Sequence, residues 1–224
     1  MPESIEVLIA GERMFALGEK ALLWPERSTL FVADVHLGKD SAMIASSIPV
    51  PLGATTESLC RLSRLIEQTG VSSLVLLGDL WHAKAGRSDQ VYGEFVVWTR
   101  MHAGVKMTLV EGNHDIKAGP LTAETRIEEV SEPFRMSPFV LCHVPQVSDD
   151  GYVLAGHIHP GVVLEGFGRQ SIKLPCFWFG NRMCVLPAFG EFTGCARVAP
   201  VEGDRVLVVA NGQVLPVQTV VAEP

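Results

Sequence analysis

The tetrapeptide GNHD at residues 112–115 follows the apolar run TLV at residues 108–110, with one glutamate, Glu111, between them. Glycine makes up about 7% of average protein sequence and the other three residue types a few per cent each, so chance occurrence in a chain of this length is on the order of one in a thousand. The run TLV predicts a buried strand. We therefore expect a functional site where this strand ends.

Four further polar clusters also follow apolar, strand-like runs. They are DVH at residues 34–36, GD at 78–79, His143 after FVLC, and GHIH at 156–159. In open α/β sheets, ligands bind in the crevice beyond the carboxyl ends of the strands. We therefore expect the five clusters to form one site, although they span more than a hundred residues.

The residue types in these clusters fit a site for two metal ions. Two carboxylates, one amide oxygen and four imidazoles are oxygen and nitrogen ligands that suit Mn, Fe or Zn better than calcium. A shared carboxylate can hold two divalent ions roughly 3.5 to 4 Å apart, and Asp79 is the candidate for that bridge. Two such cations would also allow a phosphate diester to bind inside an acidic protein.

Composition limits the class of protein. The 224 residues are 47% hydrophobic and 19% charged, which predicts one globular domain over residues 1–224. The net charge of -7 excludes long-range attraction of a polyanion to the whole surface. The five cysteines contain no CxxC pair, which argues against a disulfide framework and against a structural zinc site. No apolar run is long enough to span a bilayer and no signal peptide is recognised, so we expect a cytoplasmic protein without a membrane partner.

Periodicity predicts strands and helices in alternation through the first half of the chain. Strands are expected within residues 5–34, helices over Gly53–Gly70 and Gln90–Ala103, and an irregular connection over Lys39–Leu52. Thr55 or Thr56 is expected to cap the first of these helices. Beyond residue 133 the chain predicts short strands, which together with the helices indicates layered sheets covered by helices.

The end of the chain predicts a hairpin. The runs RVLVVA and QVLPVQTVV are joined by Asn211-Gly212, a strong turn signal between strands. We expect this hairpin to close a sheet edge or to contact a second copy of the chain. No catalytic role is expected for it.

The ordered series DVH, GD, GNHD, H and GHIH resembles the five-block signature of the calcineurin-like metallophosphoesterases. The resemblance covers about residues 30–160. It implies an α/β fold of two packed mixed β-sheets flanked by helices, a four-layer α/β/β/α sandwich. It also implies metal-dependent hydrolysis of phosphoesters.

The same resemblance implies a role for each motif residue. It places two metal ions on the motif side chains, one on Asp34, His36, Asp79 and His159, the other on Asp79, Asn113, His143 and His157. His114 resembles the catalytic histidine of the family, which orients the phosphate or protonates the leaving oxygen, and Asp115 would hold its imidazole. His82 either lines the site or closes a turn. The basic residues near the motifs are candidate phosphate contacts, Lys39 and Arg87 first, then Lys84 and Lys117.

A narrower resemblance is to the ligase-associated DNA damage response endonucleases of bacteria. It rests on VADVHLGK at residues 32–39, LVLLGDLWHAKAGR at 74–87, GNHDIKAG at 112–119 and LPAFGEFTG at 186–194. It implies a phosphodiesterase that acts on nucleic acid with manganese as the favoured ion. It further implies a functional association with an ATP-dependent DNA ligase and a helicase.

The predicted function is a dinuclear phosphodiesterase, an endonuclease or related DNA-processing enzyme in bacterial DNA repair. A metal-bridging hydroxide is expected to attack phosphorus in line, while His114 assists the leaving group. Two alternatives stay open: a hydrolase of small phosphodiesters or phosphomonoesters, and a non-catalytic binding or scaffolding module. The oligomeric state is left open.

Overall fold

The first β-sheet has seven strands that lie side by side in the order of the sequence, in a computed structural model that describes residues 2–166 and 170–217. Strands β1 to β4 pair antiparallel, and β4 to β7 pair parallel. The strands are β1 Ser4–Ile9, β2 Glu12–Leu17, β3 Ala21–Trp24, β4 Thr29–Val32, β5 Ser73–Leu77, β6 Lys106–Val110 and β7 Glu128–Val130.

The central strands of this sheet are buried on both faces. In β4, Leu30 and Val32 pack in the cluster beneath the helices, while Phe31 between them packs toward the second sheet. In β5, Leu76 packs in the cluster beneath the helices and Val75 packs toward the second sheet. Because neighbouring residues of a strand point to opposite faces, a continuous apolar run produces a sheet covered on both sides.

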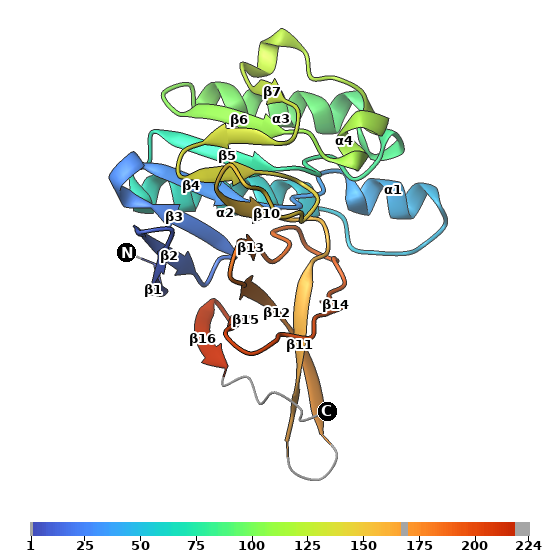
Figure 1. Cartoon of the computed structure of the whole chain (residues 1–224). Helices are drawn as coiled ribbons and strands as arrows, with labels where there is room; N and C mark the ends of the chain where they lie inside the picture. The colour runs from blue at the N-terminus through green and yellow to red at the C-terminus, as the bar shows by residue number, and fades with distance from the viewer. Residues whose placement is uncertain (1, 167–169, 218–224) are drawn as a thin grey trace.

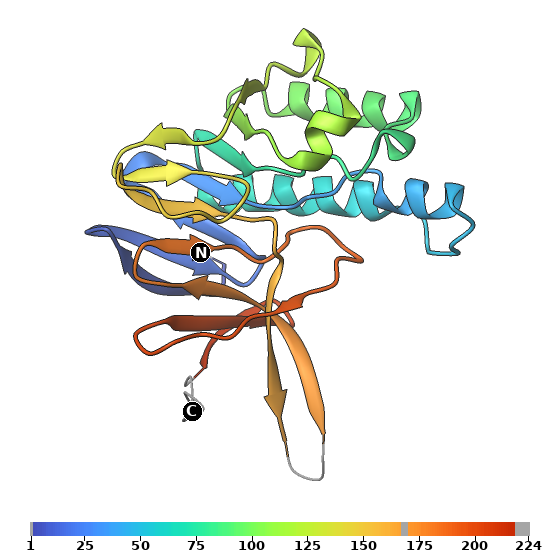
Figure 2. The same cartoon turned by 45° about the vertical axis from the view of Figure 1, so that its right-hand side comes forward.

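The α-helices gather on the outer face of the first sheet (Figures 1 and 2). Trp98 on the third helix donates from Nε1 to Ser63 Oγ on the second at 2.9 Å, and Ser63 Oγ also lies 2.8 Å from His102 Nε2. These contacts join the two long helices above the sheet. The helices are α1 Lys39–Ala45, α2 Ala54–Thr69, α3 Asp89–Met101 and α4 Asn113–Ala118, with short 3-10 turns η1 Pro25–Arg27, η2 Lys84–Gly86 and η3 Ala123–Thr125.

The second sheet packs against the inner face of the first and contains nine strands. Its main path runs β14-β11-β12-β13-β10-β9-β8, and β15 pairs with β12 and β16. β10 is parallel to β9 and β13, so this sheet is mixed. The strands are β8 Phe134–Met136, β9 Phe139–Leu141, β10 Tyr152–Ala155, β11 Pro160–Glu165, β12 Ser171–Phe179, β13 Met183–Val185, β14 Ala196–Arg197, β15 Arg205–Ala210 and β16 Gln213–Val217.

The expected α/β fold of two packed mixed sheets flanked by helices is confirmed. In the described ranges no α-helix follows α4, so the second sheet carries no outer helical layer there and the four-layer sandwich is not completed by these residues. β11 and β12 instead extend from the body as a two-stranded arm (Figures 1 and 2). The predicted terminal hairpin is present as β15 and β16, with Asn211-Gly212 at its turn, and residues 218–221 of the prediction lie outside the described part.

Two local predictions are wrong. Helix α1 replaces the first half of the irregular connection, and Gly53 rather than a threonine occupies the N-cap of α2. The buried carboxylate of Asp40 explains the second, because it accepts the N–H groups of Gly53 at 2.8 Å and Ala54 at 3.1 Å at the start of α2. Thr55 Oγ1 accepts the Gly38 N–H at 2.9 Å instead of capping its own helix. None of the helices in the described ranges has both the length and the hydropathy needed to span a bilayer.

Arg61 joins α2 to the turn between β2 and β3 and to the loop after β13, and its removal is expected to destabilise the fold. The buried guanidinium pairs with Glu19 at 3.0 Å and Glu191 at 2.6 Å, and lies 4.2 Å from the centroid of the Phe189 ring. Arg61→Met should lower the free energy of unfolding by about 1 to 3 kcal/mol, because it leaves the buried carbonyl oxygen of Phe189 without its donor, while the partly exposed carboxylates of Glu19 and Glu191 remain solvated. Urea unfolding followed by circular dichroism measures this change.

Arg64 on the same helix provides the matched control. Its ion pair with Glu57 at 3.2 Å is half exposed on both sides, with 54% and 55% of the side chains accessible. Arg64→Met should therefore change the free energy of unfolding by no more than about 0.5 kcal/mol. Equal losses for the two variants would contradict an anchoring role for Arg61.

Candidate metal centre

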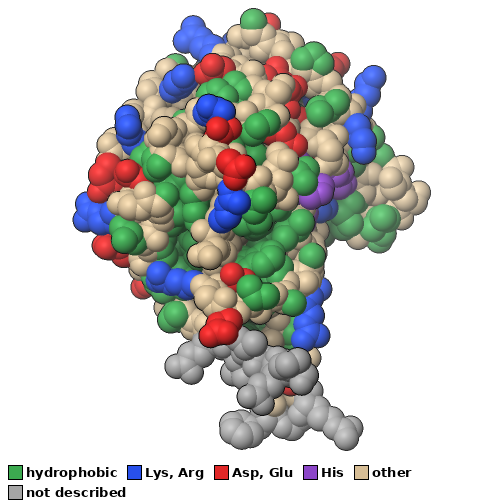
Figure 3. All heavy atoms as spheres, in the orientation of Figure 1, with side chains coloured by type: hydrophobic (Ala, Val, Ile, Leu, Met, Phe, Trp, Pro, Cys, Tyr) green, Lys and Arg blue, Asp and Glu red, His purple; other side chains and the backbone are tan. Residues whose placement is uncertain are grey.

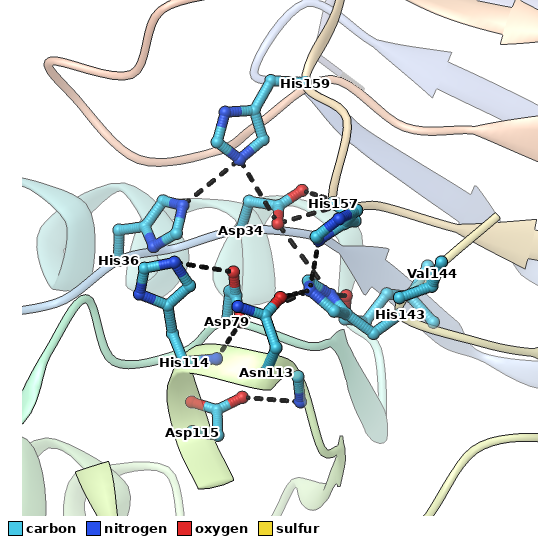
Figure 4. Close-up of polar contacts among 12 residues, drawn as sticks. Asp34, His36, Asp79, Asn113, His114, Asp115, His143, Val144, His157 and His159 are labelled. Atoms are coloured by element: carbon cyan, nitrogen blue, oxygen red, sulfur yellow. Dashed lines mark hydrogen bonds and ion pairs between the residues drawn. The ribbon is translucent and has the colours of Figure 1, made fainter. Parts of the chain in front are cut away.

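The five polar motifs converge at one edge of the two sheets. β4, β5 and β6 of the first sheet lead into DVH, GD and GNHD, and β9 and β10 of the second sheet lead into His143 and GHIH. Figure 4 shows their side chains pointing toward one another. Histidine side chains reach the surface here, with Lys or Arg side chains close by (Figure 3). The expectation that strand ends bring these motifs together is confirmed.

Asp34, His36 and His159 form the first candidate metal group, with ligand atoms within 4.8 Å of one another. His159 Nε2 lies 3.2 Å from His36 Nε2 and 3.4 Å from Asp34 Oδ1. The other ring nitrogen of His159 lies 3.3 Å from the Gly194 carbonyl oxygen, which it can reach only as an N–H donor. This bond leaves the Nε2 lone pair facing the other two side chains.

Asp79, His143 and His157 form the second candidate group. His143 Nε2 lies 3.0 Å from His157 Nδ1 and 3.3 Å from Asp79 Oδ1. The amide oxygen of Asn113 joins this group at 3.1 Å from His143 Nε2. His143 Nδ1 donates to the Leu77 carbonyl oxygen at 3.1 Å, which again fixes the tautomer and turns Nε2 inward.

The electrostatics of the second group favour a positive charge. Burial by itself lowers the pKa of His143, but its hydrogen bond to Asp79 and the negative charges of Asp79 and Asp34 raise that pKa to about 9. In the first group, burial lowers the pKa of His36 to about 2, against the opposing charge of Asp79, so this imidazole stays neutral. A neutral imidazole is the form that binds a metal ion.

The donor set fits two divalent metal ions. Each group brings together oxygen and nitrogen lone pairs at separations where they repel unless a proton or a cation lies between them. Asp79 belongs to the second group and its charge also acts on His36 of the first. Carboxylate, amide and imidazole ligands suit Mn, Fe or Zn.

Backbone strain is concentrated in this centre. A positive φ is uncommon for residues other than glycine and costs about 1 kcal/mol or more at each position. Of the twelve such residues in the described part of the chain, five are motif residues of the two groups: Asp34, His36, Asp79, His157 and His159, with φ from 48° to 70°. The chain therefore turns sharply at the strand ends in order to direct these side chains inward.

Two motif glycines leave room for carboxylates of the centre. A Cβ atom on Gly156 would lie 2.7 Å from Asp34 Oδ2, and a Cβ atom on Gly112 would collide with the Asp79 side chain and backbone. The Asp79 contact involves a candidate ligand and its fixed backbone, so nothing flexible can give way. Small residues at these two positions are thus a condition for the geometry of the centre.

Gly112→Ala is accordingly expected to displace Asp79 and to lower phosphodiester turnover about a hundredfold, as shifts of about 1 Å do in active sites. Turnover of bis(p-nitrophenyl) phosphate and the dissociation constant for Mn²⁺ measure the effect. Gly93→Ala in α3 is the control, because an added Cβ meets nothing within 4 Å there. Unchanged turnover in Gly112→Ala would contradict the close approach of the two loops.

His114 lies beside the second group and remains partly exposed. Its backbone N–H donates to Asp79 Oδ1 at 2.9 Å, and its Nε2 lies 3.9 Å from Asp79 Oδ2. Its Nδ1 pairs with the His82 carbonyl oxygen, and the rings of His82 and His114 stack with centroids 5.5 Å apart. His82 therefore lines the centre rather than only closing a turn.

The expected role of Asp115 requires a correction. Its buried carboxylate does not hold the His114 imidazole, whose Nδ1 has the His82 carbonyl as its partner. It accepts instead the N–H groups of Trp81 at 2.9 Å, Gly112 at 3.0 Å and Leu80 at 3.3 Å. Burial raises the pKa of Asp115 to about 6, although these three donors lower it in part. Asp115 ties the loop after β5 to the start of α4.

The basic residues that the sequence predicts as phosphate contacts differ in their surroundings. Burial lowers the pKa of Lys39, and the charge of Asp34 opposes that shift. The guanidinium of Arg87 donates to the carbonyl oxygens of residues 118, 119 and 120 and lies 4.3 Å from the Tyr92 ring centroid. Arg87 is therefore engaged in holding the loop after α4 rather than free for a phosphate. Lys84 and Lys117 are exposed.

Glu132 is one residue of the centre that the sequence did not reveal. Its Oε2 accepts the N–H of His143 at 2.6 Å and that of Val144 at 2.9 Å. These bonds fix the loop that carries His143. An isolated glutamate before a proline carries no recognisable signal, since its partner lies eleven residues further along the chain.

Fold and centre together define a metal-dependent phosphoesterase. Scans against protein-family models and against curated proteins give no match. Among solved structures, the chain is similar to the nuclease MPE of Pseudomonas putida, with a TM-score of 0.84 and 37% identity over 96% of this chain and 100% of that one. It also matches YfcE, a phosphoesterase from E. coli, with a TM-score of 0.39 and 14% identity over 82% of this chain and 88% of that one, a likeness too low to carry an argument.

The likeness to the Pseudomonas nuclease extends over nearly the whole chain. With more than a third of the residues identical along nearly the whole length, the chain belongs with that nuclease to the calcineurin-like metallophosphoesterases.

Proposed function

We propose that this enzyme is a manganese-dependent phosphodiesterase that cleaves nucleic acid, an endonuclease or related DNA-processing enzyme in bacterial DNA repair. The observation that carries the proposal is the pairing of two candidate metal groups with a partly exposed histidine, His114, beside the carboxylate of Asp79. The name of the related protein, a nuclease, supports a nucleic-acid substrate.

In this proposal the motif residues divide between two divalent metal ions. Asp34, His36 and His159 hold one ion and Asn113, His143 and His157 hold the other, while Asp79 serves both. Two cations bound there would lower the pKa of a water molecule and neutralise charge on the phosphate oxygens. Mn²⁺ is the proposed ion, because the ligands are oxygen and nitrogen atoms without a thiolate.

His114 is the proposed acid for the leaving oxygen. Its Nδ1 faces the His82 carbonyl oxygen, which requires an N–H at Nδ1, and its Nε2 is the atom left to face the substrate. A proton on Nε2 can pass to the oxygen that departs from phosphorus. The carboxylate of Asp79 lies 3.9 Å from Nε2.

Lys39 is the proposed contact for a phosphate oxygen of the substrate. Its amine is half-buried near Asp34, whose negative charge favours the ammonium form. Attraction of a phosphodiester is then local, in an otherwise acidic protein. An association with an ATP-dependent DNA ligase and a helicase belongs to the same proposal and rests on the resemblance of the sequence motifs.

We also propose that residues 1–224 form one domain. The centre takes its ligands from loops of both sheets, so neither sheet can hold both metal ions alone. Separation of the two sheets would therefore abolish the site.

The test is Mn²⁺-dependent turnover of three substrates side by side: bis(p-nitrophenyl) phosphate, supercoiled plasmid and single-stranded DNA. Cleavage of the model diester and of DNA is the expected result. Cleavage of the diester with both DNA substrates intact would indicate a hydrolase of small phosphodiesters. No turnover with any divalent metal would indicate a binding or scaffolding module.

A further inference from the structure

Phe192 has an unusual backbone and an unusual exposure. It lies in the loop between β13 and β14 with φ of 56°, and 47% of the residue is accessible to solvent. The left-handed region is unfavourable for a bulky side chain. Among the described residues with positive φ, it has the one phenyl side chain. The strained backbone conformation thus accompanies an apolar side chain that is exposed to solvent.

The loop around Phe192 is firmly anchored. Thr193 Oγ1 donates to the Gly190 carbonyl oxygen at 2.6 Å, which closes a tight turn with Phe192 inside it. Glu191 pairs with the buried Arg61, which also donates to the Phe189 carbonyl oxygen at 3.1 Å. The exposure of the ring is therefore set by the fold rather than by a loose loop.

Both ends of this loop are bonded to the metal centre. The Gly190 N–H donates to the Asp34 carbonyl oxygen at 3.0 Å, and the Gly194 carbonyl oxygen lies 3.3 Å from His159 Nδ1. Phe192 is two residues from each of these contacts, a span of at most about 7 Å of chain. Phe192 therefore lies on a loop whose two ends border the metal centre.

The surface beside the centre contains further exposed apolar side chains. Ile116, two residues after His114, is 68% exposed, and Val144, next to His143, is 38% exposed. A phosphate alone would gain nothing from apolar neighbours. A substrate with an apolar group attached to its phosphate would bury the side chains of Ile116 and Val144 and gain binding free energy from their burial.

The charge of the protein makes such a contact useful for a nucleic acid. With a net charge of -7 the surface offers little long-range attraction for a polyanionic strand. Stacking of a base on an aromatic ring does not depend on charge and accepts every base, because every base has a π-face. It therefore supplies affinity that the acidic surface lacks.

We propose that Phe192 is a specificity-determining residue on which a nucleobase next to the scissile phosphodiester stacks. The inference rests on the proposed nuclease function, whose substrate it describes further. A base can offer its face to the ring only where it is not stacked within a duplex. The anchored loop would hold the ring in place beforehand, so that binding does not have to order it.

The test compares wild type with Phe192→Ala, Phe192→Leu and Phe192→Trp on a single-stranded oligonucleotide. Each is also assayed on the same oligonucleotide with abasic residues around one fixed cleavage position. We expect Phe192→Ala and Phe192→Leu to raise KM for the normal oligonucleotide at least about fivefold with kcat changed less than about threefold, and Phe192→Trp to retain the wild-type KM. On the abasic oligonucleotide, wild type and Phe192→Trp should show the same rise in KM, while Phe192→Ala and Phe192→Leu should show no further rise.

Leu8→Ala on the edge strand β1 is the control for removal of an exposed apolar side chain, since Leu8 is 76% exposed. Its KM should equal that of wild type. Equal KM for wild type and Phe192→Ala on the normal oligonucleotide would overturn the inference. So would a rise in KM on the abasic oligonucleotide that is as large in Phe192→Ala as in wild type. Absence of any oligonucleotide cleavage by wild type would instead reject the proposed nuclease function, and the inference with it.

Discussion

Asp79→Asn is expected to lower phosphodiester turnover by at least about a thousandfold. The carboxylate lies 3.3 Å from His143 Nε2 in one metal group, and its charge acts on His36 in the other, so the amide weakens both sites at once. Loss of a metal ion removes the means of lowering the pKa of a bound water molecule to near neutrality. Turnover of bis(p-nitrophenyl) phosphate and Mn²⁺ content per chain measure the effect.

Asp150→Asn is the matched control for loss of one carboxylate. Asp150 pairs with Arg135 at 2.5 Å on the exposed surface, where such ion pairs contribute little. Its turnover should stay within about twofold of wild type. Normal turnover in Asp79→Asn would contradict the assignment of this residue to the centre. If the protein were a non-catalytic scaffolding module, both variants would still bind its partner.

His114→Ala is expected to show a different pattern. Cleavage of an oligonucleotide should fall by about 10² to 10⁴, the usual contribution of a general acid, while two Mn²⁺ ions per chain remain bound. Turnover of bis(p-nitrophenyl) phosphate should fall less, because p-nitrophenolate leaves as a stable anion without a proton. Rates on both substrates, with metal content measured alongside, separate protonation of the leaving oxygen from metal binding.

His102→Ala controls for removal of an imidazole outside the centre. His102 contacts Ser63 and the Trp98 ring between α2 and α3. Stability should fall in this variant while both rates stay near wild type. An equal fall on both substrates in His114→Ala, or loss of Mn²⁺ from that variant, would contradict its assignment as an acid.

The sequence was sufficient to predict the convergence of the motifs. Each cluster is local in sequence and follows an apolar run, as GNHD follows β6 and GHIH follows β10. Strand ends at one edge of a sheet lie close together whatever the number of residues between them. This accounts for the meeting of DVH, GD and GNHD, which follow strands of the first sheet, whereas His143 and GHIH join them because the second sheet packs against the first.

Features that depend on long-range partners could not be predicted. The start of α2 is capped by the buried Asp40 carboxylate of α1, which accepts N–H groups thirteen and fourteen residues away. Asp115 binds the loop after β5 across more than thirty residues, and Arg61 reaches Glu191 across 130. No local pattern identifies such partners, since each needs the tertiary arrangement to exist first.

We propose that two divalent metal ions act together in this centre. The most direct test strips the enzyme of metal, adds Mn²⁺ in steps, and follows turnover of bis(p-nitrophenyl) phosphate at a chain concentration well above the dissociation constants. We predict no turnover without metal and a plateau at two Mn²⁺ per chain. Full turnover without metal, or a plateau at one Mn²⁺ per chain, would contradict the claim.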